Sequence, residues 1–228
     1  MKIIPSKNKI IKSNIYIIIL SLVLTTLIIN ALAHIIKDIF ANSDILNFTL
    51  ITFQQIFLVV WIWYFIKKNI FPNFKKLFKL PSIKVLFLEI TKTYFYLIMF
   101  GILLGVLKYN LNLEIPGFSQ QKDILGLFPQ SGILFYLTLL NATVIAPIIE
   151  ELIFRGALLT NLCKKYSNLT SVLISSLIFS LIHFQPEVFG AIFLISLLLS
   201  RLFLKTNSLV APIMFHILNN TLKTILTL

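Results

Sequence analysis

Long runs of apolar residues alternate with short, lysine-rich segments along the 228 residues of this chain. Most runs are about 17–25 residues long, the length of helix that crosses the hydrocarbon core of a bilayer. Their apolar positions are continuous rather than alternating, which favours helices over the strands of an outer-membrane barrel. The pattern predicts an all-α, polytopic transmembrane helix bundle of about seven spans: Asn14–Ala33, Phe48–Ile66, Val85–Leu107, Ser131–Leu162, Leu169–Phe184, Val188–Leu204 and Leu209–Leu226.

The connections between the predicted spans are short, with no internal repeat and no low-complexity linker, so we expect one integrated membrane domain. Within it, residues 1–130 would form the N-terminal transmembrane helices and loops, and residues 131–228 a helical core. The run from Ser131 to Leu162 is longer than a bilayer requires, so part of that helix is expected to project beyond the hydrocarbon.

Composition agrees with a bilayer environment: 58% of the residues are hydrophobic and 12% are charged, against about 25% charged in a typical soluble domain. The net charge of +12 would suit a nucleic-acid-binding protein. However, the lysines collect between apolar runs, as they do in the cytoplasmic loops of membrane proteins. We therefore expect the lipid bilayer as a partner and no nucleic acid.

The basic residues are distributed unequally between the two ends of the predicted spans. Fifteen of the twenty fall on one side: Lys2, Lys7, Lys9, Lys12, Lys67, Lys68, Lys75, Lys76, Lys79, Lys84, Arg155, Lys164, Lys165, Arg201 and Lys205. The positive-inside rule then predicts a multi-pass cell-membrane protein with its N-terminus in the cytoplasm and its C-terminus outside. The richness in lysine and isoleucine is typical of an AT-rich bacterial genome, so we expect the bacterial inner membrane.

Ionisable residues within a span cost about 2.5–3.5 kcal/mol on insertion scales and are therefore candidates for function. In the third span, Glu89 and Lys92 are three residues apart and are expected to neutralise each other. In the fourth, Glu150 and Glu151 are adjacent, so they point about 100° apart and are not expected to share a partner. Glu151 and Arg155 are four apart, which predicts an ion pair that leaves Glu150 free to face the bundle interior.

Two later spans carry further polar residues at helical spacing. Phe179 and His183 are four apart in the fifth span, and His216 and Asn220 are four apart in the seventh, so each pair shares a helix face. Two histidines, an asparagine and a glutamate pair in three neighbouring spans can converge only around a shared polar cavity. We therefore expect these residues to act together rather than as separate buried polar groups.

The three motifs occur in one order along the chain: Glu150-Glu151-x-x-x-Arg155, Phe179-x-x-x-His183 and His216-x-x-x-Asn220. In this order they resemble the CAAX protease and bacteriocin-processing family of intramembrane endopeptidases, also called the Abi or type II CAAX prenyl protease family. The resemblance covers roughly Ser131 to Leu226 and implies a membrane-embedded protease. It implies Glu150, His183, His216 and Asn220 as catalytic residues, and Glu151, Arg155 and Phe179 as supporting residues.

The resemblance also implies a role for each catalytic residue. Glu150 would draw a proton from water as the general base, and His183 would help to position that water. His216 and Asn220 would donate hydrogen bonds to the developing oxyanion. The substrate would be a membrane-associated protein or peptide.

Two alternatives stay open. Glu150, His183 and His216 also make a His₂Glu zinc set with an open position, although the chain has no His-Glu-x-x-His helix. A site without a metal cofactor is favoured, with zinc as the alternative. The same residues could instead serve a protein that is not a protease, such as a bacteriocin-immunity or secretion-type membrane protein or a small proton-coupled transporter.

Overall fold

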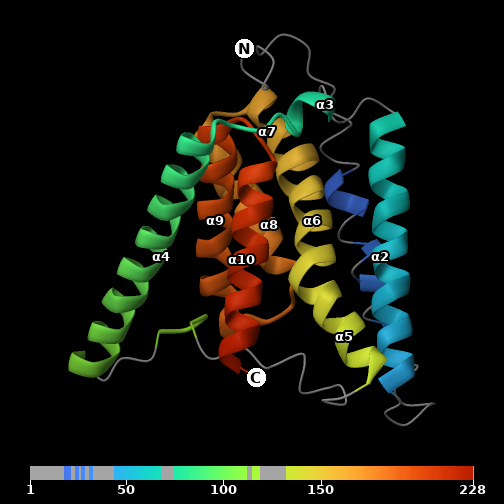
Figure 1. Cartoon of the computed structure of the whole chain (residues 1–228), viewed down its shortest axis with the longest axis horizontal. Helices are drawn as coiled ribbons and strands as arrows, with labels where there is room; N and C mark the ends of the chain where they lie inside the picture. The colour runs from blue at the N-terminus through green and yellow to red at the C-terminus, as the bar shows by residue number, and fades with distance from the viewer. Residues whose placement is uncertain are drawn as a thin grey trace.

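The computed structural model describes residues 44–67, 74–111, 115–118 and 132–227, together with several residues between positions 18 and 32. Every regular element within these ranges is helical, which confirms the all-α fold class (Figure 1). Most of the predicted first span, Asn14–Ala33, lies outside the described residues.

One helix runs without a break from Ile133 to Lys165, and it is built from five successive α- and π-helical segments. We refer to it as the long helix. The elements in chain order are α2 (Asp44–Lys67), α3 (Phe74–Leu77), α4 (Ile83–Leu111), α5 (Ile133–Leu140), η2 (Asn141–Ile145), α6 (Ala146–Glu151), η3 (Leu152–Leu159), α7 (Thr160–Lys165), α8 (Asn168–Leu181), η4 (Pro186–Val188), α9 (Phe189–Thr206) and α10 (Val210–Thr227).

Four helical stretches of the described chain are long and apolar enough to cross a bilayer, and they match the second, third, fourth and sixth predicted spans. They are Phe48–Lys67, Ile83–Leu111, Ile133–Lys165 and Pro186–Thr206. α8 is a shorter apolar helix of 14 residues. α10 has 18 residues but is not among the four, because His216, Asn219 and Asn220 lower its hydropathy. The total of seven spans therefore stays a prediction.

The outer helices present large apolar side chains to their surroundings. Phe87 and Ile98 on α4 are exposed, as are Phe53 and Trp63 on α2. Exposing apolar surface to water costs about 25 cal/mol per Å², whereas lipid chains solvate such surface at no comparable cost. The exposed apolar faces therefore agree with a bundle embedded in a bilayer.

α2 and α4 flank the C-terminal helices on opposite sides, with α8, α9 and α10 between them (Figure 1). α4 packs on α9 and α10, whereas α2 packs on the long helix. The main apolar core contains Phe154 and Leu158 from the long helix, Phe179 from α8 and Phe203 from α9. The division into residues 1–130 and 131–228 stays a prediction.

α8 and α9 pack against each other, and both bury small side chains. Ser175, Ser176 and Ser180 on α8, with Ser196 and Ser200 on α9, are almost completely inaccessible. Small residues allow the backbones of membrane helices to approach closely. This packing brings Ser196 of α9 within reach of the polar site on the long helix.

α3, α7 and the start of α10 lie at the same end of the bundle (Figure 1). The backbone N–H of Leu209 donates to the carbonyl of Leu77 at 2.7 Å, which ties α3 to the start of α10. We call this the lysine-rich end because it carries Lys67, Lys75, Lys76, Lys79, Lys84, Lys164, Lys165 and Lys205.

Two arginines counted on that side form ion pairs with glutamates of the bundle. Arg155 is completely buried. Arg201 lies 3.3 Å from Glu89, which also binds Lys92 at 3.3 Å. The predicted neutralisation of Glu89 by Lys92 is therefore confirmed, and Arg201 joins α4 to α9. Sequence spacing could not reveal Arg201, because it comes from another helix.

Candidate active site

Glu150 and Glu151 end α6, a short α-helical stretch between the π-helical segments η2 and η3. At the end of η2, the backbone N–H of Ala146 donates to the carbonyl of Asn141, five residues earlier. This wider turn comes directly before Pro147, whose ring cannot donate a hydrogen bond and clashes with a carbonyl in a regular helix. π-helical turns within α-helices are frequent at functional sites.

The predicted ion pair between Glu151 and Arg155 is confirmed. The Arg155 Nη1 atom lies 2.8 Å from Glu151 Oε1, and both side chains are 0% exposed. Arg155 Nη2 also donates to the backbone carbonyl of Ser196 at 3.0 Å and to its hydroxyl oxygen at 2.8 Å. The pair is thereby held between the long helix and α9 and has no contact with solvent.

Both glutamates contact the same histidine. His216 Nδ1 lies 2.9 Å from Glu151 Oε1, and His216 Nε2 lies 3.8 Å from Glu150 Oε2. The expectation that adjacent glutamates would not share a partner is wrong, because an imidazole presents two nitrogens in different directions. Glu150 keeps 28% of its side chain exposed while Glu151 has none, so Glu150 is the carboxylate that water can reach.

Phe179 packs among the site residues. Its ring centroid lies 4.8 Å from that of Phe154, 4.7 Å from that of His183 and 6.3 Å from that of His216. The Arg155 guanidinium lies over the same ring at 4.9 Å. Phe179 is therefore the apolar contact that the charged pair and both histidines share.

His183 lies just after the end of α8, and its Nδ1 atom is 2.6 Å from the carbonyl oxygen of Phe179. A carbonyl only accepts, so Nδ1 carries a proton, and the tautomer with a single ring proton keeps Nε2 as an acceptor. At about 1.5 Å per residue, the 14 residues of α8 extend about 21 Å, less than the roughly 30 Å hydrocarbon core. The end of α8 can therefore lie within the bilayer.

Asn220 faces the long helix from α10. Its side-chain nitrogen donates to the backbone carbonyl of Ala142, in η2, at 3.1 Å. The amide has a second N–H, which this bond leaves available. Sequence spacing placed Asn220 on the same helix face as His216 but gave no partner for it, because the Ala142 carbonyl is a backbone atom in another helix.

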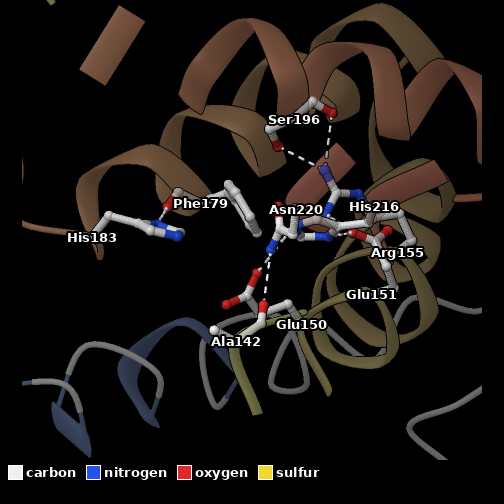
Figure 2. Close-up of polar contacts among 9 residues, drawn as sticks. All are labelled: Ala142, Glu150, Glu151, Arg155, Phe179, His183, Ser196, His216 and Asn220. Atoms are coloured by element: carbon white, nitrogen blue, oxygen red, sulfur yellow. Dashed lines mark hydrogen bonds and ion pairs between the residues drawn. The ribbon is translucent and has the colours of Figure 1, made fainter. Parts of the chain in front are cut away.

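Figure 2 shows how the predicted residues converge. Glu150 and Glu151 from α6 meet His216 and Asn220 from α10, and the Arg155 guanidinium lies between Glu151 and Ser196. His183 lies to one side, beyond the ring of Phe179. Among the described residues, no hydrogen bond or ion pair joins His183 to Glu150 or to His216.

The proposed zinc ligands do not form a preformed metal site. No group of three or more His, Cys, Asp or Glu side chains in the described part of the chain is arranged to hold a metal ion. The Nδ1 atoms of both histidines are hydrogen-bonded to protein oxygens, which leaves Nε2 of each ring as the nitrogen that could bind a metal. The two rings lie on different sides of Phe179, so His183 and His216 are not gathered with Glu150 around one point in this arrangement.

All the residues of this site lie within positions 132–222, which match a family model described as type II CAAX prenyl endopeptidase Rce1-like. This region of the chain is similar to the Rce1-like family. The match confirms the family that the three motifs indicate. It spans less than half of the chain and leaves out α2 and α4. Searches of curated proteins and of solved structures return no match.

The Rce1-like region and the apolar helices together indicate a membrane-embedded protease of the CAAX type. Within that region, the long helix supplies the carboxylates and α10 supplies His216 and Asn220.

Proposed function

We propose that this protein is an intramembrane endopeptidase that hydrolyses a peptide bond of a membrane-associated protein or peptide, with Glu150 as the general base. One observation carries the proposal. Glu150 is a partly exposed carboxylate that faces His216, and the opposite nitrogen of His216 is held by the fully buried Glu151–Arg155 pair. Such a pairing of a reactive group with an oriented histidine is a recurring arrangement in hydrolytic sites.

The two glutamates are suited to different tasks. Glu151 is inaccessible to water and already accepts from Arg155 and His216 through one oxygen. Glu150 is accessible, and among the described residues it makes no hydrogen bond; His216 Nε2 lies 3.8 Å from its Oε2 atom. Proton abstraction requires a carboxylate that can contact water, so we assign the base to Glu150 and a positioning role to Glu151.

The distance between Glu150 and His216 suits a water molecule held by both. His216 donates through Nδ1 to Glu151, and in the tautomer with a single ring proton this leaves Nε2 as an acceptor. At 3.8 Å, Glu150 Oε2 and His216 Nε2 are too far apart for a direct hydrogen bond. They are close enough for one water to donate to each, which would aim its lone pair at a substrate carbonyl.

The hydrolysis then balances as follows. A water O–H bond breaks, its proton passes to Glu150, and the hydroxide oxygen bonds to the carbonyl carbon. The carbonyl oxygen becomes an oxyanion, and the free N–H of Asn220 is the donor that we assign to it. As the C–N bond breaks, Glu150 returns the proton to the leaving nitrogen. We assign His183 to hold the water or the substrate through Nε2, and His216 to hold the water rather than the oxyanion.

The decisive experiment uses purified protein in liposomes with membrane-associated peptides as probes. Glu150→Gln should insert and unfold as wild type does, yet lose cleavage by about 10²–10⁴-fold. Glu187→Gln, which changes an exposed carboxylate outside the site, should cleave as wild type does. Full cleavage by Glu150→Gln would remove the proposal. Flux of protons or solute that depends on Glu150, with no cleaved product, would favour the transporter alternative.

We further propose that the lysine-rich end faces the cytoplasm of a bacterial cell, with the protein in the inner membrane. The support is the gathering of α3, α7 and the start of α10 at one end, with lysines on each segment or next to it. Cytoplasmic ends of membrane proteins carry an excess of lysine and arginine.

A further inference from the structure

Residues 74–84 cross the lysine-rich end of the bundle from α3 to the start of α4 (Figure 1). We call this stretch the α3–α4 segment. The sequence contains no aspartate or glutamate between Asp44 and Glu89, so no carboxylate of the segment offsets its charge. Its four lysines are all exposed: Lys75, Lys76, Lys79 and Lys84. The α3–α4 segment is therefore a strongly cationic part of the surface.

Large apolar side chains stand between these lysines. Leu80 is 61% exposed, Ile83 is 80% exposed and Phe78 is 39% exposed. In water such exposure carries a cost in proportion to the apolar area. At a membrane interface the cost disappears, because apolar side chains enter the boundary with the acyl chains while lysines extend to the headgroups. Nucleic acid or an acidic protein would satisfy the lysines but would leave Leu80 and Ile83 without an apolar partner.

The backbone of the α3–α4 segment is fixed by contacts with the bundle. Leu77 is 0% exposed and packs in the main apolar core, and its carbonyl accepts the Leu209 N–H at 2.7 Å. The Lys79 N–H donates to the carbonyl of Lys76 at 3.2 Å, which closes the turn after α3. Because Leu209 directly precedes α10, its contact with Leu77 joins the segment to the helix that carries His216.

The lysines of α7, at the same end of the bundle, differ from those of the segment. Lys164 and Lys165 are half-buried. The Lys164 amine donates to Asn161 Oδ1 at 2.8 Å, and the Lys165 amine lies 4.8 Å from the centre of the Tyr166 ring. These two cations have partners within the protein, so the exposed lysines of the α3–α4 segment are better placed to bind an external anion.

We propose that the α3–α4 segment binds the headgroups of anionic phospholipids, with Leu80 and Ile83 inserted at the boundary with the acyl chains. The charges are complementary, because each headgroup presents a phosphate and the segment offers four cations without a carboxylate. A basic residue beside a membrane span strengthens binding to an anionic membrane about fivefold. Through the contact of Leu77 with Leu209, headgroup binding also stabilises the start of α10. This inference goes beyond the proposed function and does not depend on it.

The test compares exposed lysines at the two ends of one helix. Lys84→Gln changes the end of α4 that belongs to the α3–α4 segment, and Lys108→Gln is the matched control at the other end. The triple variant Lys75→Gln/Lys79→Gln/Lys84→Gln removes three cations, and Lys75→Arg/Lys79→Arg/Lys84→Arg keeps them. Each full-length protein is placed in vesicles of equal parts phosphatidylcholine and phosphatidylglycerol and extracted in mild detergent. Native mass spectrometry then counts the lipids that each protein retains.

Thermal unfolding of the same proteins is measured in this mixture and in phosphatidylcholine alone. Two further samples in phosphatidylcholine alone receive soluble glycerol phosphate or an RNA oligonucleotide. Wild-type protein should unfold at a higher temperature when phosphatidylglycerol is present. Glycerol phosphate should give no such stabilisation because it has no acyl chains, and neither should RNA.

Wild-type protein should also retain phosphatidylglycerol in preference to phosphatidylcholine. Lys84→Gln should lower that preference about fivefold and the triple glutamine variant about 10²-fold, whereas the triple arginine variant and Lys108→Gln should keep it. Leu80→Gln should weaken the preference although every lysine remains.

A preference that survives in the triple glutamine variant, or that Lys84→Gln and Lys108→Gln reduce equally, would overturn the proposal. Equal stabilisation by glycerol phosphate would also overturn it in favour of a site for free phosphate, and equal stabilisation by RNA in favour of nucleic acid. A lipid preference without any rise in unfolding temperature would overturn the stabilisation of α10.

Discussion

His216 Nδ1 and Glu151 Oε1 lie 2.9 Å apart, and the same carboxylate oxygen lies 2.8 Å from Arg155. One buried oxygen therefore accepts from two side chains on two helices. This contact fixes which nitrogen of His216 carries the proton, because a carboxylate oxygen only accepts from its neighbours. Glu151 thus belongs to the site as a positioning residue, although it has no contact with solvent.

Replacing Glu151 should destabilise the protein far more than replacing Glu150. Glu151→Gln leaves the buried guanidinium of Arg155 without its opposite charge, and breaking one partner of a buried ion pair costs about 3–5 kcal/mol. Glu150 is partly exposed, and in the described part of the chain it has no such buried partner. Thermal unfolding in detergent should show a large loss for Glu151→Gln and a small one for Glu150→Gln. Equal unfolding of the two variants would contradict the assignment of separate roles.

Substituting Phe179 should impair cleavage more than it impairs stability. Phe179→Leu keeps an apolar side chain but removes the ring that contacts Arg155, His183 and His216. We expect about a tenfold loss of kcat with a modest change in thermal unfolding. Phe203→Leu is the control, because Phe203 is equally buried but lies outside the site. An equal loss of activity in both variants would show that Phe179 contributes only to packing.

Asn220 can be tested with the adjacent Asn219 as its matched control. Asn220→Ala removes the donor to Ala142 and the proposed oxyanion contact, and loss of one oxyanion donor costs about 10²–10³-fold in kcat. Asn219→Ala changes the same kind of side chain one position earlier and should keep near-normal kcat. Steady-state cleavage of one peptide by both variants measures the difference. Similar kcat values for the two would remove Asn220 from the catalytic set.

Membrane orientation can be tested at two points of the chain. A reporter that is active only in the cytoplasm should be silent when fused after Leu228 and active when inserted next to Lys79, at the lysine-rich end. The reason is the positive-inside rule applied to the lysines of α3 and α7. Activity after Leu228 would place the C-terminus in the cytoplasm and overturn the predicted topology.

We predict that cleavage does not depend on a bound metal. We expect cleavage to survive chelation and the purified protein to carry less than stoichiometric zinc, because Glu150, His183 and His216 do not form a joint metal site. Elemental analysis and activity should be measured on the same preparation before and after chelation. Stoichiometric zinc that is lost together with activity, and restores it when added back, would favour the zinc alternative.

The sequence predicted the local relationships and missed those between helices. Four of the long apolar runs are helices with the expected length, and the Glu151–Arg155 and Glu89–Lys92 pairs follow from helical spacing. Contacts of Glu151 with His216, and of Glu89 with Arg201, join residues far apart in the chain. Helical spacing has no information about such contacts, because they depend on how the helices pack.

Two other features escaped prediction for more specific reasons. The fifth predicted span ended at Phe184, whereas α8 ends at Leu181. Apolar residues continue beyond the helix end, so hydropathy could not locate the turn in which His183 lies. The backbone conformations of Phe184 and Gly117, both with positive φ, also escaped prediction. Gly117 carried a weak signal as a glycine next to a proline, but nothing in the sequence marked Phe184.

The π-helical turn η2 sets the rotational phase of the long helix. An α-helix advances about 100° per residue. A π-turn accommodates one additional residue, so it rotates the side chains that come before the turn about the helix axis relative to Glu150. Ala142 consequently presents its carbonyl to Asn220 on α10. A chain one residue shorter in this turn would form a more regular helix but would aim a different carbonyl at α10. The alignment of the two motif-bearing helices is therefore encoded in the number of residues as well as in their identity.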